Sequence, residues 1–87
     1  DPNAPNTDAR IMELAYLLTK QGEYAQAAVN YELLAVRYPD SPYCPRAIYT
    51  AQIIYHTKLN DEGHAARLVE LLRTKYPDSC YASVLRR

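Results

Sequence analysis

The sequence contains no tryptophan and no phenylalanine, and it has only one methionine, two glycines and two cysteines among 87 residues. Ten basic and ten acidic side chains cancel, so no excess charge of one sign is present to attract a nucleic acid or an anionic membrane. No apolar run approaches the ~18 residues that a membrane-spanning helix needs. Two cysteines are too few for a disulfide framework. We therefore expect no nucleic-acid partner and no direct membrane insertion.

The sequence also lacks a signal-peptide pattern and a lipidation motif. If the protein is exported, we expect its targeting segment to lie outside these residues. A domain of this length buries only about 60–65% of the surface that its unfolded chain exposes, so its stability is marginal. We therefore expect one domain that gains stability from neighbouring parts of a longer assembly.

The chain repeats itself at a fixed period. Residues 38–41 read Tyr-Pro-Asp-Ser, and the same four residues return at 76–79, which is 38 positions later. The same shift, applied without a gap, also pairs Ala27 with Ala65, Ala28 with Ala66, Glu32 with Glu70 and Leu34 with Leu72. A period of roughly 20–50 residues is typical of repeat proteins, in which one unit cannot bury its apolar face alone. Two tandem copies of one structural unit are therefore predicted.

The first copy has the pattern of two helices joined by a tight turn. Apolar residues recur at helical spacing from residue 9 to about residue 20, and again over about 23–38. Thr7 or Asp8 can cap the first helix. Gly22 supplies the left-handed conformation that ends it, and a proline stops the second helix. So short a turn makes the two helices antiparallel.

The second copy predicts a third helix over about 46–58 and a fourth that reaches residue 76. The third helix is apolar on more than one side, which indicates neighbours on two faces. Either Ser41 or Cys44 can cap the third helix, and either Asn60 or Asp61 can cap the fourth.

Together these patterns predict an all-α fold of tandem antiparallel helical hairpins. We expect a flexible lead-in over residues 1–7, a first repeat over about 8–41 and a second over about 45–79. The tail over 80–87 begins like another hairpin, so we expect it to form a short capping helix.

The spacing of these residues resembles the tetratricopeptide repeat, in which a small residue of the first helix faces an alanine and an aromatic of the second. In the first copy the matching residues are Ile11, Leu14, Ala15, Leu18, Gly22, Tyr24, Ala27, Tyr31, Leu34 and Pro39. In the second copy they are Tyr49, Gln52, Ile53, His56, Ala65, Val69, Leu72 and Pro77, with Ile53 at the small position. The resemblance covers almost the whole chain and implies an α-solenoid.

The linker after the first copy, YPDSPYCPRA, is similar to that of the longer repeats of bacterial outer-membrane assembly and Tol-Pal-associated periplasmic proteins. This likeness favours the periplasm or cell envelope of a bacterium, and the residues themselves do not fix a compartment.

The resemblance implies a concave surface, formed by the first helix of each hairpin, that receives a peptide or a partner helix. The matching positions are Met12, Glu13, Tyr16, Thr19 and Lys20, followed by Thr50, Ile54, Thr57 and Lys58. Met12 and Tyr16 stand where chaperone-binding members clamp a peptide carboxylate, so chaperone C-termini are not expected as ligands. The alternative is a structural or self-associating segment of a longer solenoid, with neighbouring repeats or further copies as its partners.

Nine tyrosines stand in place of phenylalanine and tryptophan, and interface hot spots favour tyrosine. Five of them fall at repeat-packing or linker positions and are expected to be structural, namely Tyr24, Tyr31, Tyr38, Tyr49 and Tyr76. Tyr16 is the aromatic that we expect to contact a ligand.

Residues that could carry chemistry are few. Cys44, His56, His64 and Cys80 have no recognised zinc spacing, and His56 is expected to be an interior side chain. The two cysteines occupy equivalent linkers, which leaves open whether they are free or bridged. The acidic residues fall at caps and solvent faces, and no glycine-rich phosphate loop is present. We therefore expect a protein without catalytic activity, cofactor or metal.

Overall fold

The computed structural model describes residues 7–85, which form five helices and no strands. In chain order the helices are α1 (Asp8–Lys20), α2 (Tyr24–Arg37), α3 (Cys44–Thr57), α4 (Glu62–Lys75) and α5 (Cys80–Leu85). The all-helical prediction is confirmed, and the short fifth helix is present. The predicted flexible lead-in falls outside the described residues except for Thr7, and so do the last two residues of the predicted capping helix.

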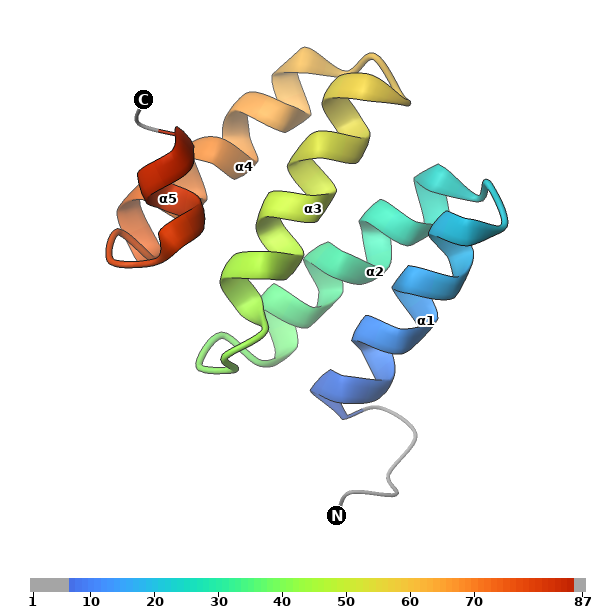
Figure 1. Ribbon diagram of the computed structural model, residues 1–87, viewed down its shortest axis with the longest axis horizontal. Helices are drawn as coiled ribbons and strands as arrows, with labels where there is room; N and C mark the ends of the chain where they lie inside the picture. Colours follow the sequence, from blue (N-terminus) through green and yellow to red (C-terminus); the bar gives the residue numbers. More distant parts are fainter. Residues whose placement is uncertain (1–6, 86–87) are drawn as a thin grey trace.

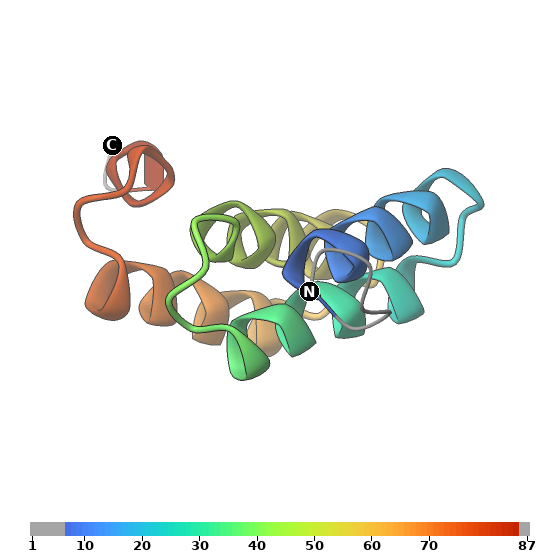
Figure 2. The same ribbon diagram turned by 90° about the horizontal axis from the view of Figure 1, so that it is seen from below.

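Each helix packs against the one that follows it, and successive helices run in opposite directions (Figure 1). Seen from below, α1, α3 and α5 form one layer, and α2 and α4 form the other (Figure 2). The described part of the chain measures 38 × 28 × 16 Å, so it is a flat slab two helices deep.

The helix ends are set by local residues, mostly those that the pattern indicates. Thr7 caps α1, where its Oγ1 accepts a hydrogen bond from the Arg10 amide at 3.4 Å. Gly22 has a φ of 84° just after α1, in the region that favours glycine. Neither predicted cap lies at the start of α3, because Tyr43 holds that position and Ser41 Oγ accepts from its amide at 3.1 Å.

In the second copy, the structure decides which residue caps α4 and shows how α3 is buried. Asp61, not Asn60, caps α4, where its side chain accepts from the His64 amide at 3.0 Å. The α3 helix is covered by both α2 and α4, which confirms its predicted burial on two faces. Its buried residues are Cys44, Ala47, Ile48, Ala51, Ile54 and Tyr55.

Alanine is the most frequent residue of the core, and its small side chain lets the helix backbones approach closely. Five alanines of the first three helices are 0% exposed, namely Ala15, Ala27, Ala28, Ala47 and Ala51. Leu34, Ile48 and Leu72 are the large apolar side chains that are also fully buried. Because alanine side chains bury little apolar area, the few large side chains contribute most of the stabilisation from burial.

The gap-free alignment of the two copies is wrong for α3. It places Ile53 opposite Ala15, but Ile53 is 39% exposed, and the fully buried small residues of α3 are Ala47 and Ala51. The reason is length: α3 has 14 residues against 13 in α1, and its turn to α4 covers residues 58–61, whereas the first turn covers 21–23. The two extra residues move the buried face of α3 by two positions.

Both cysteines are free thiols, so the two linkers are not bridged in this structure. Cys44 is buried and its Sγ lies 2.8 Å from the carbonyl oxygen of Tyr38, whereas Cys80 is exposed. The two linkers are joined instead by the Tyr76 hydroxyl, which donates to the Pro39 carbonyl at 2.6 Å. The repeated Tyr-Pro phrase therefore has a structural role at this contact.

Candidate partner-binding site

A hollow of about 510 Å³ lies on the face of the slab where α1 and α3 are neighbours. We call it the α1/α3 hollow. Five predicted site residues line it, namely Met12, Glu13, Tyr16, Thr19 and Thr50. The remaining lining residues are Ala9, Tyr31, Tyr43 and Arg46. The structure thus gathers the predicted residues of α1 except Lys20, and one of those from the second copy.

Aromatic and apolar groups dominate the α1/α3 hollow. Tyr31 of α2 is only 4% exposed, whereas Tyr16 and Tyr43 are 55% and 39% exposed. The hydroxyl of Thr19 donates to the Ala15 carbonyl at 2.8 Å, which leaves its oxygen as an acceptor for a ligand. Large tyrosine surface with a few polar groups is typical of a protein-binding surface.

Charged groups lie at the edges of the α1/α3 hollow. Glu13 pairs with Arg10 at 3.5 Å, and both side chains are 59% exposed. The Lys20 amine lies 5.3 Å from the centre of the Tyr16 ring. Arg46 has no ion pair within residues 7–85, so it is the cation of this site that a partner carboxylate can reach.

The other four predicted residues lie outside the hollow. Ile54 is 4% exposed and belongs to the core, so its side chain offers almost no surface to a partner. Thr57 and Lys58 are exposed at the far end of α3, where the Lys58 amine lies 5.2 Å from the Tyr24 ring. Lys20 covers part of Tyr16 without lining the hollow.

The sequence reading missed Arg46 and Tyr43. Arg46 stands four residues before Thr50 and therefore on the same side of the helix, a spacing that could have identified it. Tyr43 lies in the linker, and no periodicity there indicated which way it points.

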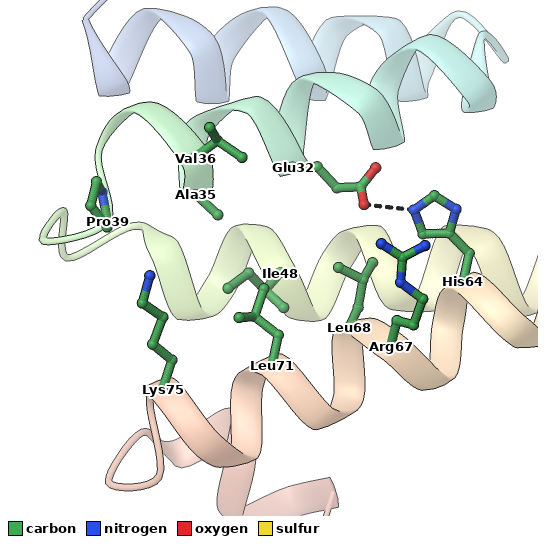
Figure 3. Close-up of a pocket in the computed structure, with 10 residues that line it drawn as sticks. All are labelled: Glu32, Ala35, Val36, Pro39, Ile48, His64, Arg67, Leu68, Leu71 and Lys75. Carbon is green, nitrogen blue, oxygen red and sulfur yellow. Dashed lines mark hydrogen bonds and ion pairs between the residues drawn. The ribbon is translucent and has the colours of Figure 1, made fainter.

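A second pocket, of about 550 Å³, lies on the opposite face between α2 and α4 (Figure 3). We call it the α2/α4 pocket. It is lined by Glu32, Ala35, Val36, Pro39, Ile48, His64, Arg67, Leu68, Leu71 and Lys75. None of these residues was predicted as a site residue.

A hydrogen-bonded cluster closes one end of the α2/α4 pocket. Glu32 accepts the Tyr55 hydroxyl at 2.7 Å and pairs with His64 Nε2, also at 2.7 Å. The rings of Tyr55 and His64 stack with centres 3.9 Å apart. Both oxygens of this half-buried carboxylate are thus used inside the protein.

The expectation that His56 is an interior histidine is wrong. Its side chain is 55% exposed and its Nδ1 lies 2.6 Å from Glu62. His64 is the packed histidine, with 30% of its side chain exposed. The altered register of α3 explains the difference, because it turns His56 outwards.

In the part of the chain that the structure describes, no three histidine, cysteine, aspartate or glutamate side chains gather as a metal site would require. No helix between residues 7 and 85 is long and apolar enough to cross a membrane.

Comparisons with known proteins leave the family open. No protein-family model matches the chain, and no curated protein and no solved structure matches it either. The likeness to the tetratricopeptide repeat therefore stays a prediction carried by the residues quoted above.

Alkaline pH is expected to destabilise the fold. Burial, and next the hydrogen bond to Glu32, raise the pKa of Tyr55 well above its ordinary value of 10.0. Burial and the adjacent Cys44 raise the pKa of Tyr76 to about 12. The unfolded chain loses these two protons near pH 10 while the folded protein keeps them, so the free energy of unfolding falls as pH rises from about 10 towards about 12.

Urea unfolding followed by circular dichroism at a series of pH values measures this effect. The urea concentration at the unfolding midpoint should stay constant as pH approaches about 9, and it should fall as pH rises above about 10. Replacing Tyr76 with phenylalanine should reduce the slope, which separates the tyrosines from lysine titration in the same range. A midpoint that stays constant through about pH 11 would contradict the raised pKa values.

Proposed function

We propose that this protein is a non-enzymatic protein-interaction module that binds a peptide segment or helix of a partner protein in the α1/α3 hollow. The observation that carries the proposal is the gathering of Met12, Tyr16, Tyr31 and Tyr43 around a surface hollow of about 510 Å³. Tyrosine rings give a large contact area at low cost in side-chain entropy, and they recur among interface hot spots.

The shape of the protein supports this proposal and the tetratricopeptide-like solenoid that goes with it. Antiparallel helix pairs in two layers are what stacked repeats of that kind form, and α1 and α3 occupy the layer that would face the ligand. The likeness of the linker to bacterial envelope repeats makes an envelope assembly our proposed setting.

The chemistry of the hollow suggests the kind of segment that fits. An apolar or aromatic side chain can fill the hollow, where it would contact Met12 and the tyrosine rings of the lining. A carboxylate nearby can pair with Arg46, and backbone amides can donate to the threonine oxygens. We therefore propose a partner segment with one large apolar side chain and a neighbouring acidic group.

A second candidate function is structural association with a neighbouring repeat or another copy. Leu14 and Leu17 are 50% and 46% exposed on α1 and lie outside the α1/α3 hollow. In a longer solenoid such an edge would be covered by the preceding helix pair. Light scattering over a concentration series separates the two candidates, because association without any peptide ligand favours the structural one.

Replacing Tyr16 with alanine tests the binding proposal. A peptide is first selected from a displayed library on the wild-type protein, and its affinity is then measured by fluorescence polarisation. We expect Tyr16→Ala to weaken binding about tenfold, or about 1.4 kcal/mol, because the ring is part of the contact. Since Tyr16 is exposed, the helical spectrum should not change.

The matched control is Leu17→Ala, on the same helix and of similar exposure but outside the hollow. It should leave the affinity unchanged. Equal losses for both variants, or no loss for Tyr16→Ala, would contradict binding in the α1/α3 hollow.

A further inference from the structure

The floor and walls of the α2/α4 pocket are apolar. Ile48 of α3 forms the floor, with Leu68 and Leu71 on the α4 side and Ala35 on the α2 side (Figure 3). Val36 at the edge is 78% exposed, the largest exposure among the large hydrophobic side chains described. A pocket of about 550 Å³ with such a lining can hold one large apolar side chain and part of a backbone.

Two cationic side chains lie beside this apolar surface and make no ion pair within residues 7–85. Arg67 and Lys75 both extend from α4 across the pocket towards α2 (Figure 3). Within residues 7–85 neither side chain makes a hydrogen bond or an ion pair. The one acidic lining residue, Glu32, has both oxygens occupied by His64 and Tyr55. Counting Glu32, the lining carries two cations and one carboxylate, so an excess of positive charge remains beside the apolar floor.

The spacing of the cations suggests the form of the ligand. Arg67 and Lys75 are eight residues apart on one helix, which separates their backbone positions by about 12 Å. In an extended peptide, residues i, i+2 and i+4 point to one side and the outer two lie about 13 Å apart. Two carboxylates at i and i+4 can thus meet the two cations while the side chain at i+2 enters the pocket.

We propose that the α2/α4 pocket is a second binding site, for an acidic peptide segment that carries an apolar side chain between two carboxylates. This site lies on the opposite face from the α1/α3 hollow and can be occupied independently. A single small anion would reach only one of the cations and leave the apolar floor uncovered. An anionic membrane attracts clusters of four or more basic residues, and this pocket has two in a chain of zero net charge.

The experiment is an NMR titration of the wild-type protein with the end-capped peptide Glu-Ser-Leu-Ser-Glu. We expect saturable shifts of the amides of Ala35, Leu68 and Leu71. The neutral peptide Gln-Ser-Leu-Ser-Gln should bind about four- to 25-fold more weakly, because both charge pairs are lost. Arg67→Ala and Lys75→Ala should each lower the affinity for the acidic peptide about two- to fivefold, as expected for exposed ion pairs.

Arg73→Ala is the matched control. Arg73 lies on the same helix but outside the pocket, where it pairs with Glu70 at 3.6 Å. Its replacement changes the net charge of the protein by the same amount as Arg67→Ala or Lys75→Ala. It should not alter the affinity, and Tyr16→Ala should not either, which keeps this test independent of the α1/α3 hollow.

Several results would overturn the proposal. They are the absence of saturable binding, equal affinity for the neutral peptide, and equal weakening by Arg73→Ala. Vesicles containing phosphatidylserine provide the remaining comparison. Vesicle binding that depends on Arg67, without peptide binding, would assign the cations to a lipid surface and overturn the peptide as the occupant.

Discussion

Replacing Leu34 with alanine is expected to lower the free energy of unfolding by about 3 kcal/mol. Leu34 is 0% exposed, and seven of the sixteen buried apolar residues of the described chain are alanines, so short side chains have little volume with which to fill the cavity. The total stability of a small domain is about 5–15 kcal/mol, and a chain of this length lies at the low end. Urea unfolding followed by circular dichroism measures the loss.

Leu33→Ala is the control, because it removes the same atoms from the adjacent residue. Leu33 is 38% exposed and leaves no closed cavity when shortened, so we expect a loss of about 1 kcal/mol or less. Similar losses for the two variants would mean that α2 is rotated relative to the packing described, with Leu34 outside the core.

Glu32→Ala is expected to destabilise the protein by about 2 kcal/mol. The variant leaves the hydroxyl of Tyr55, a residue only 6% exposed, without its acceptor and removes the hydrogen-bond partner of His64 Nε2. An unsatisfied buried donor costs more than an average hydrogen bond contributes, because the lost bond to water is not replaced. Urea unfolding near neutral pH measures the effect.

The repeat provides the control for this variant. Glu70 stands at the matching position of the second copy, but its side chain is 66% exposed and, within residues 7–85, pairs only with Arg73 at 3.6 Å. Glu70→Ala should change the free energy of unfolding by no more than about 0.5 kcal/mol. Adding Tyr55→Phe to Glu32→Ala should recover part of the loss, since no hydroxyl is then left unpaired. Equal effects of the two glutamates would contradict a structural role for the Glu32 cluster.

The sequence predicted the helices well because their ends depend on local chemistry. Gly22 follows α1 with a positive φ, and the two Tyr-Pro phrases follow α2 and α4 directly. The 38-residue period also placed Ala27 and Ala65 correctly, and both are buried. These features need only neighbouring residues or an exact repeat to be recognised.

The errors arose where the copies differ in length. One extra residue in α3 and one in its turn moved Ala51 into the core and His56 onto the surface, which a gap-free alignment could not show. Ile54 was expected to line a groove, but α3 is covered on two sides and buries it. Because α3 is covered on two sides, it has fewer exposed residues that could line a site than α1 has.

The α2/α4 pocket was missed for a different reason. Its cluster joins Glu32 to His64 across 32 residues, and no local pattern indicates that pairing. The cations of the pocket, Arg67 and Lys75, look like ordinary surface residues in a helical pattern. Their significance depends on which acidic groups lie nearby, and that is known only once α2 and α4 are placed together.

The central claim, that the α1/α3 hollow binds a segment of a partner protein, is tested most directly by amide chemical-shift mapping with the selected peptide. We expect the largest shifts at Met12, Tyr16 and Thr19 of α1 and at Thr50 of α3, which line the hollow. Shifts confined to the exposed edge at Leu14 and Leu17, or spread over the chain without a maximum at these four residues, would contradict the account.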